Sequence, residues 1–277
     1  MPAAPRLTRR RSDRTRVVRA GDACFGDGGF ALIGGPCSVE SRDQLLVVAG
    51  AVERAGGVML RGGAWKPRTS PYDFQGLGDL AIELLVEAGR RSRLPIVVEA
   101  LAERHVAMLV ANVAMIQIGA RNMHNVPLLQ SAARSGLPIL LKRGPSATLD
   151  ELLLAAEYVL LEGNDRIVLC ERGIRSFDAA TRNVLDLGGA LRLKEMTDLP
   201  VIVDPSHASG RRSLIEPLTL AAAAAGLDGA MVEVHPKPEE ALSDAAQAID
   251  CATFLRIARA VSAIRSSLLD PPRFAIA

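Results

Sequence analysis

The chain has 277 residues, of which 49% are apolar and only 3% aromatic, and its net charge is +2. This length suits one large domain, and a core of Ala, Leu and Val is typical of parallel strands covered by helices. No run approaches the ~20 apolar residues of a membrane span. Four scattered cysteines without a CxxC pair argue against a disulfide framework and favour a reducing compartment. We therefore expect a cytoplasmic protein with no membrane partner.

The chain begins with a basic stretch. Residues 1–20 hold seven Arg and one Asp, a charge of +6, which leaves +2 − 6 = −4 for the rest. Few apolar residues accompany these charges, so we expect a solvated tail with neither a secretory signal nor a nucleic-acid partner. Residues 1–29 contain no strand–helix unit and form an Arg-rich extension, either a tail or a short capping hairpin.

From residue 30 onward, short apolar runs alternate with helical patterns. The expected strands are 30–33, 58–60, 96–98, 115–118, 139–141, 167–169, 201–203 and 230–232. The expected helices are 42–55, 77–90, 102–111, 126–135, 149–161, 184–194, 212–225 and 245–267. Eight strand–helix units in series predict a single (β/α)8 TIM barrel over 30–277 and disfavour an open doubly wound sheet. The absence of GxGxxG after the first strand also weakens a dinucleotide-binding interpretation.

Cationic side chains gather where the expected strands end, which is the catalytic face of such barrels. They are Arg61, Lys66, Arg68, Arg121, Lys142 and Arg172. Six cations are more than a single bound carboxylate requires, but they suit two phosphorylated anions. Glu99 closes the third strand, where it could orient a cation or a bound water, or simply pair with an Arg.

A second set of polar residues at the strand ends is Cys37, His207, Glu233 and Asp244. A thiolate, an imidazole and two carboxylates suit one divalent ion such as Mn, Fe, Co or Zn. No local spacing proves this site, because the four residues follow different strands. Alone, Cys37 could be a small buried residue, and His207 a general base or a structural histidine.

Seven motifs occur in order along the chain. They are GGPCSVES at 34–41, KPRTS at 66–70, IGARNM at 118–123, LKRG at 141–144, CERG at 170–173, DPSH at 204–207 and VEVHP at 232–236. Together they resemble the type I 3-deoxy-D-arabino-heptulosonate 7-phosphate (DAHP) synthases, in the subgroup closest to the octulosonate 8-phosphate synthases. The resemblance runs from about Phe30 to Ser267. It implies a (β/α)8 barrel that catalyses the first step of the shikimate pathway to aromatic amino acids.

The resemblance also implies roles for individual residues. The metal ligands would be Cys37, His207, Glu233 and Asp244, the last in a Leu-Ser-Asp stretch. Phosphoenolpyruvate would be held by Arg61, Lys66, Arg121 and Lys142. Erythrose 4-phosphate would be held by Arg68, Thr69 and Ser70, with Arg172 near a phosphate. The implied chemistry is an aldol-type condensation in which the metal polarises the aldehyde and Lys66 protonates the new alkoxide.

Regulation is expected to differ from that of many relatives. Members of this subgroup often carry an N-terminal regulatory domain, whereas only about 29 residues precede the expected barrel here. We therefore expect no inhibition by phenylalanine or tyrosine through a built-in domain, and a separate regulatory partner stays possible. The family is commonly a dimer or tetramer, so a homo-oligomer is expected.

Four alternatives stay open. An octulosonate or nonulosonate phosphate synthase shares the barrel, but octulosonate enzymes favour Lys-Ala-Asn-Arg where this chain has KPRTS. A variant acting on an aminated tetrose phosphate is possible, as is a catalytically silent partner barrel. An aldolase that forms a Schiff base on Lys142 is disfavoured, because the Arg-rich surroundings of Lys142 suit anion binding equally well.

Overall fold

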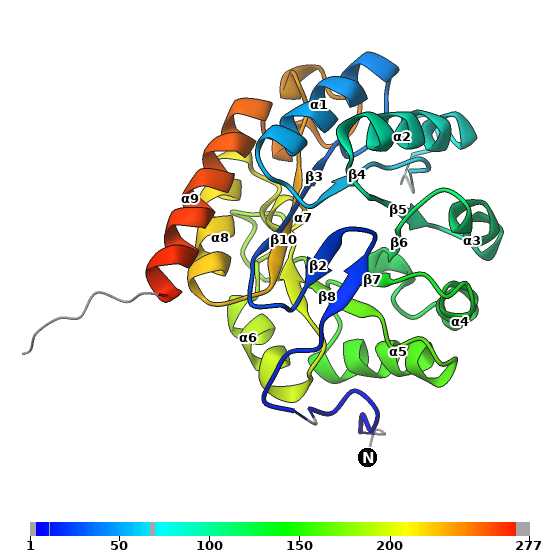
Figure 1. The fold of residues 1–277 in the computed structure, drawn as a ribbon, viewed down its shortest axis with the longest axis vertical. Helices are drawn as coiled ribbons and strands as arrows, with labels where there is room; N and C mark the ends of the chain where they lie inside the picture. Colours follow the sequence, from blue (N-terminus) through cyan, green and yellow to red (C-terminus); the bar gives the residue numbers. More distant parts are fainter. Residues whose placement is uncertain (1–3, 11, 67–69, 270–277) are drawn as a thin grey trace, which may run out of the picture.

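A computed structural model describes residues 4–10, 12–66 and 70–269 of the chain. Eight parallel strands close into a barrel in the order β10-β3-β4-β5-β6-β7-β8-β9 (Figure 1). The strands are β3 (Ala31–Gly35), β4 (Met59–Arg61), β5 (Ile96–Ala100), β6 (Met115–Ile118), β7 (Ile139–Lys142), β8 (Ile167–Glu171), β9 (Val201–Val203) and β10 (Gly229–Glu233). Each includes or overlaps the apolar run from which it was predicted, and the (β/α)8 fold is confirmed.

The helices form a ring outside the barrel (Figure 1). They are α1 (Arg42–Arg54), α2 (Asp79–Ser92), α3 (Glu103–Val110), α4 (Val126–Arg134), α5 (Leu149–Leu161), α6 (Leu187–Met196), α8 (Arg212–Ala224) and α9 (Cys251–Leu269). Local signals set where several of them begin. For example, Thr148 and Glu151 form a reciprocal capping box at the start of α5. Among the described residues, none of the helices is long and apolar enough to cross a membrane.

The last predicted helix starts later than expected. Residues 245–267 were predicted as one helix, but Ala245–Gln247 forms a separate 3-10 turn, η3, and α9 begins at Cys251. The reason is that Ile249 lies extended beside the end of β10, where its carbonyl accepts the His235 N–H at 2.9 Å and its own N–H donates to Glu233. An additional short helix, α7 (Pro205–Ser209), follows β9.

The N-terminal stretch packs against the barrel, and the prediction of a solvated tail was wrong. The backbone N–H of Arg16 donates to the Asp198 carbonyl at 2.6 Å, and its guanidinium pairs with the Asp198 carboxylate at 3.2 Å. The N–H groups of Leu7 and Thr8 both donate to Glu157 on α5, at 2.6 and 3.2 Å. Charge composition missed these contacts because several of them satisfy backbone groups and the others join residues far apart in the sequence, neither of which composition reports.

The alternative of a capping hairpin is confirmed. Strands β1 (Val18–Ala20) and β2 (Ala23–Phe25) pair antiparallel, and in Figure 1 this blue hairpin lies across the middle of the ring of helices. Its buried side chains join the apolar cluster inside the barrel, and Phe25 is fully buried there. The barrel interior is therefore closed with apolar side chains at the amino ends of the strands. A second apolar cluster lies between the strands and the helices. Polar groups are left to the carboxyl ends of the strands.

Candidate active site at the mouth of the barrel

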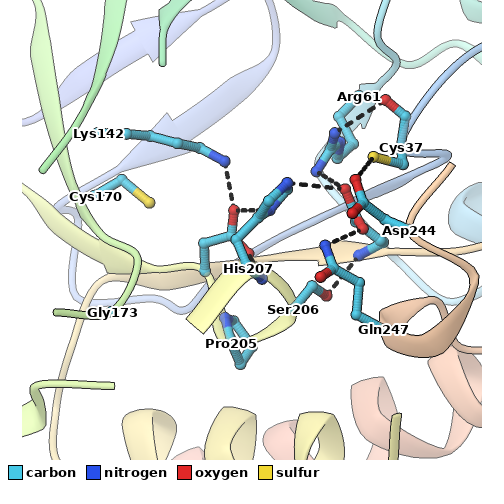
Figure 2. A network of polar contacts seen from close by, with 12 residues as sticks. Cys37, Arg61, Lys142, Cys170, Gly173, Pro205, Ser206, His207, Asp244 and Gln247 are labelled. Carbon is cyan, nitrogen blue, oxygen red and sulfur yellow. Dashed lines mark hydrogen bonds and ion pairs between the residues drawn. The ribbon is translucent and has the colours of Figure 1, made fainter. Parts of the chain in front are cut away.

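Four residues that could hold a metal ion converge at the carboxyl ends of the strands, and Figure 2 labels three of them, Cys37, His207 and Asp244. Cys37 lies in the loop after β3, His207 on α7, Glu233 at the end of β10, and Asp244 just before η3. One ligand atom from each of the four lies within 4.8 Å of the others. Asp244 has a left-handed backbone (φ 54°), a conformation that Asp tolerates better than most residues and that turns its carboxylate toward the group.

The two oxygens of the Glu233 carboxylate have different surroundings. Oε2 accepts a hydrogen bond from Gln247 Nε2 at 2.7 Å. Oε1 is buried without a hydrogen bond, although it lies 3.2 Å from Arg61 Nη1 and 3.2 Å from His207 Nε2. A buried carboxylate oxygen without a hydrogen bond is costly unless a cation compensates it. Oε1 contacts His207 Nε2, and one oxygen of Glu233 lies within 4.8 Å of the ligand atoms of Cys37, His207 and Asp244, so the residues present fit a divalent ion.

The Cys37 thiol and the Asp244 carboxylate share a hydrogen bond of 3.0 Å (Figure 2). Burial, reinforced by the charge of Glu233, raises the pKa of Cys37 well above that of a free thiol. Burial alone would also raise the pKa of Asp244, but the Cys37 hydrogen bond and the charge of Lys66 lower it to about 2. The thiol is therefore protonated when no cation is bound, and metal binding would release its proton.

Asp204 is a fully buried carboxylate that contacts both the possible metal ligand His207 and the cationic residue Lys142. Its Oδ2 accepts from His207 Nδ1 at 2.7 Å and also pairs with Lys142 Nζ. The Asp204 bond holds Nδ1 of the imidazole and leaves Nε2 facing Glu233. Burial would raise the pKa of Asp204, but His207 and Lys142 lower it well below its usual range. Asp204 was noted from the sequence only as part of a motif.

A cavity of about 230 Å³ opens directly beside the four possible ligands. Five cationic residues contribute to its lining: Lys66, Arg121, Lys142, Arg172 and Arg182. Within the described part of the chain, Arg172 makes no hydrogen bond or ion pair, although it is only 9% exposed. Burial lowers the pKa of this guanidinium, so its charge is poorly compensated without an anion. The negative charge of a phosphorylated ligand in the cavity would therefore compensate these cations strongly.

The other predicted anion-binding residues occupy different positions. Arg61 is buried against Glu233 and does not line this cavity, whereas Glu99 does line it and accepts from Gln117 Nε2 at 2.9 Å. Gly119 gives the Glu99 carboxylate its space, because a Cβ at position 119 would lie 1.9 Å from Glu99 Oε1 and would displace it. Ser70 is absent from the lining, and its hydroxyl accepts the Tyr72 N–H at 3.2 Å. Arg68 and Thr69 lie outside the described residues.

Two residues at the mouth were missed from the sequence. Gln247 contacts Glu233, and Arg182 Nη1 contacts both Gln247 Oε1 at 3.0 Å and Asp244 Oδ1 at 3.4 Å. Neither carries a motif of its own. The one signal for Gln247 was its position three residues after the predicted ligand Asp244. Trp65 was noted only in the loop after the second strand, but its ring stacks on buried His105 with centroids 3.8 Å apart.

The sequence profile of the DAHP synthetase I family matches residues 14–269. The chain belongs to this family. Phospho-2-dehydro-3-deoxyheptonate aldolase of Thermotoga maritima is 46% identical over 252 residues, which cover 91% of this chain and 75% of that protein. The crystal structure of the Thermotoga enzyme, named DAHP synthase, superposes with a TM-score of 0.92 at 44% identity, covering 95% of this chain and 78% of that chain. A truncated form of it superposes with a TM-score of 0.88 at 41% identity, covering 95% of this chain and 97% of that chain.

The octulosonate branch of the superfamily is also similar, but more distantly. The 2-dehydro-3-deoxyphosphooctonate aldolase of Syntrophotalea carbinolica is 31% identical over 252 residues, covering 84% of this chain and 90% of that protein. The predicted resemblance to DAHP synthases, with octulosonate synthases as more distant relatives, is confirmed.

Proposed function

We propose that this chain is a DAHP synthase. It condenses phosphoenolpyruvate with erythrose 4-phosphate to give 3-deoxy-D-arabino-heptulosonate 7-phosphate and inorganic phosphate, the first step of the shikimate pathway. The observation that carries this function is the cavity lined by five cationic residues directly beside Cys37, His207, Glu233 and Asp244. Its cations match two phosphorylated substrates, and the adjacent donor set matches a divalent ion that acts on an aldehyde.

The cationic side of the cavity binds phosphoenolpyruvate in this proposal. Lys66, Arg121 and Lys142 line it, and Arg61 lies behind the metal ligands, where it fixes Glu233. Arg172 supplies a buried positive charge for a phosphate. Erythrose 4-phosphate is assigned to Arg68, Thr69 and Ser70, which follow Lys66 in the sequence. Glu99 contributes a carboxylate at the substrate cavity.

Cys37, His207, Glu233 and Asp244 would hold one divalent ion, drawn from Mn, Fe, Co and Zn. When bound, such an ion supplies Lewis acidity toward the aldehyde carbonyl. Asp204 orients His207 for this role through its Nδ1. Arg61 and Gln247 fix the Glu233 carboxylate from two sides, at 3.2 and 2.7 Å.

Lys66 is placed to move a proton. Its Nζ lies 2.8 Å from Cys37 Sγ and 3.8 Å from Asp244 Oδ2, at the border between the ligand group and the cavity. Burial would lower the pKa of Lys66, but its contact with Cys37 and the charge of Glu233 raise it, so the amine stays protonated at neutral pH. An ammonium beside the aldehyde oxygen can donate its proton to the alkoxide that forms there.

The bond changes balance with these groups. A carbon–carbon bond forms between C3 of phosphoenolpyruvate and the aldehyde carbon, and the aldehyde oxygen takes the Lys66 proton. Water adds at C2 as the C2–O bond to phosphate breaks, leaving a ketone whose oxygen comes from the water; one proton of the water restores Lys66 and the other leaves on the inorganic phosphate. The cations of the cavity stabilise the negative charge of both phosphates throughout.

The test is substrate consumption by metal-stripped protein to which Mn²⁺ is added back. We expect phosphoenolpyruvate to be consumed with erythrose 4-phosphate only after Mn²⁺ is restored. Consumption with arabinose 5-phosphate instead would move the chain to the octulosonate branch. No consumption with either sugar would favour an aminated tetrose phosphate or a silent partner barrel.

The assembly and the location of the protein stay predictions. A homodimer or homotetramer is expected, and light scattering coupled to size exclusion would distinguish these from a monomer. Fractionation of the source cells would test the expected cytoplasmic location.

A further inference from the structure

We propose that Gln247 and Arg182 form a positioning pair that fixes both carboxylate ligands of the metal group and thereby sets its affinity for the ion. Gln247 acts through Glu233, and Arg182, which also lines the cavity, acts on the metal group through Gln247 and Asp244. The inference rests on the metal site of the proposed function, and it adds residues outside the predicted ligand and substrate sets.

Gln247 determines which oxygen of Glu233 remains for the ion. The amide is 2% exposed, and its Nε2 donates to Glu233 Oε2 at 2.7 Å (Figure 2). Because Oε2 accepts from Gln247, the oxygen left for the ion is Oε1, which is buried without a hydrogen bond and lies 3.2 Å from His207 Nε2. Gln247 therefore selects a single oxygen of the carboxylate as the ligand atom.

Arg182 determines which way the Gln247 amide points. Arg182 Nη1 is a donor only and contacts the Gln247 Oε1 atom at 3.0 Å. If the amide were reversed, its NH₂ group would face the guanidinium and its oxygen would face the Glu233 carboxylate, which would cost both hydrogen bonds. Arg182 thus keeps the donor side of Gln247 toward Glu233.

The same guanidinium reaches the second carboxylate ligand. Arg182 Nη1 lies 3.4 Å from Asp244 Oδ1, while the other oxygen of Asp244 accepts from Cys37. Gln247 and Asp244 are also joined through the backbone, because the Gln247 N–H donates to the Asp244 carbonyl at 3.0 Å. The turn η3 therefore delivers one ligand and the group that orients another.

The backbone of Arg182 is anchored to the helix that carries His207. Its N–H donates to the Ser209 carbonyl at 3.0 Å, and the next residue, Asn183, donates to the Ala208 carbonyl at 2.8 Å. Gly210 leaves room for this approach, since a Cβ there would lie 2.8 Å from Arg182 Cβ. The loop after β8 is thus connected to three of the four ligands through one arginine.

The test is Mn²⁺ and Co²⁺ titration of metal-free protein, with Gln247→Leu and Arg182→Met as variants. Groups that orient metal ligands typically contribute about 10- to 100-fold to metal affinity. We expect each variant to weaken Mn²⁺ binding by at least about tenfold and to alter the visible spectrum of bound Co²⁺. The double variant should be no weaker than the worse single one, because both residues act through one chain of contacts.

Gln130→Leu is the matched control, since Gln130 Nε2 also donates to a carboxylate, Glu162, at 2.8 Å on the outside of the barrel. It should leave the Mn²⁺ affinity and the Co²⁺ spectrum unchanged. Arg182 is 42% exposed, so Arg182→Met keeps the test available if Gln247→Leu does not fold. Parental affinity and spectrum in the folded variants, or additive effects in the double variant, would overturn the inference.

Metal binding also separates this inference from the proposed activity. A parent protein that binds Mn²⁺ through Cys37 but consumes no phosphoenolpyruvate would refute the synthase function and leave the positioning pair standing. A parent protein that binds no metal at these residues would refute the positioning pair, whatever its activity.

Discussion

The two ends of this barrel bury different kinds of side chain, apolar at one end and ionisable at the other. At the amino ends of the strands, the β1–β2 hairpin closes the interior with apolar side chains such as Phe25. At the carboxyl ends, Asp204, Glu233 and Lys142 are almost fully buried yet ionisable. Burial of apolar surface stabilises a fold, whereas burial of charge costs free energy unless a partner or ligand compensates it. The difference teaches that stability is concentrated at the closed end and binding at the open end.

The largest expected effect is the removal of a ligand from the open end. Cys37→Ala should abolish stoichiometric Mn²⁺ binding and lower the synthase rate by at least ~1000-fold, because a bound metal contributes several kcal/mol to charge stabilisation. Mn²⁺ titration and an assay of phosphoenolpyruvate consumption would measure both. Cys251→Ala, at a half-buried cysteine on α9 outside the ligand group, is the control and should retain both properties. Retention of metal binding in Cys37→Ala would remove the thiol from the site.

A substitution at the closed end should change the stability of the fold and leave metal binding unchanged. Phe25→Ala should reduce the free energy of unfolding by about 3–5 kcal/mol, the usual cost of deleting a buried phenyl group, with no change in Mn²⁺ affinity. Urea denaturation and metal titration would test this. Phe177→Ala is the matched control, because Phe177 is fully exposed and should contribute almost nothing. A tenfold change in Mn²⁺ affinity in Phe25→Ala would break the proposed division between the two ends.

Asp204 gives a sharper test of the open end, because it contacts Lys142 and His207 together. Asp204→Asn keeps the shape but weakens the hold on His207 Nδ1, so Mn²⁺ affinity should fall by about 10- to 100-fold. Phosphoenolpyruvate affinity should change in the same variant, since Lys142 loses its partner. If calorimetry showed parental affinity for both ligands, Asp204 would be a structural residue only.

The smallest predicted effect is a difference in pH dependence. Asp244 has its pKa lowered from 3.8 to about 2 in the folded chain, so it stabilises the fold above pH 4 and this stabilisation is lost as the pH falls through 2. Between pH 4 and pH 2, the free energy of unfolding of metal-free Asp244→Asn should therefore fall by about 2 kcal/mol less than that of the parent. The reduction in the free energy of unfolding that Phe25→Ala causes should be the same at both pH values. Parallel pH profiles for the parent and Asp244→Asn, measured by urea denaturation, would contradict the low pKa.

The sequence by itself determined the barrel and the composition of its mouth. An apolar run such as residues 139–141 is typical of a buried strand, and the polar residues that follow such runs meet at one end because all the strands are parallel. Cys37, His207 and Glu233 could therefore be predicted to lie together, whereas Asp244 was placed with them by its match to the family's Leu-Ser-Asp stretch. Their joint role as ligands came from the resemblance to a family, because residues on different strands have no diagnostic spacing.

Only the tertiary structure decided which groups face one another. The packing of the basic N-terminus, the pairing of Asp204 with Lys142 and the bond from Gln247 to Glu233 all join residues on different elements, through hydrogen bonds and ion pairs. Periodicity reports which side of an element is buried, and it carries no information about these pairings. A hydrogen bond also depends on distances of tenths of an ångström, which the packed barrel fixes and a one-dimensional pattern does not.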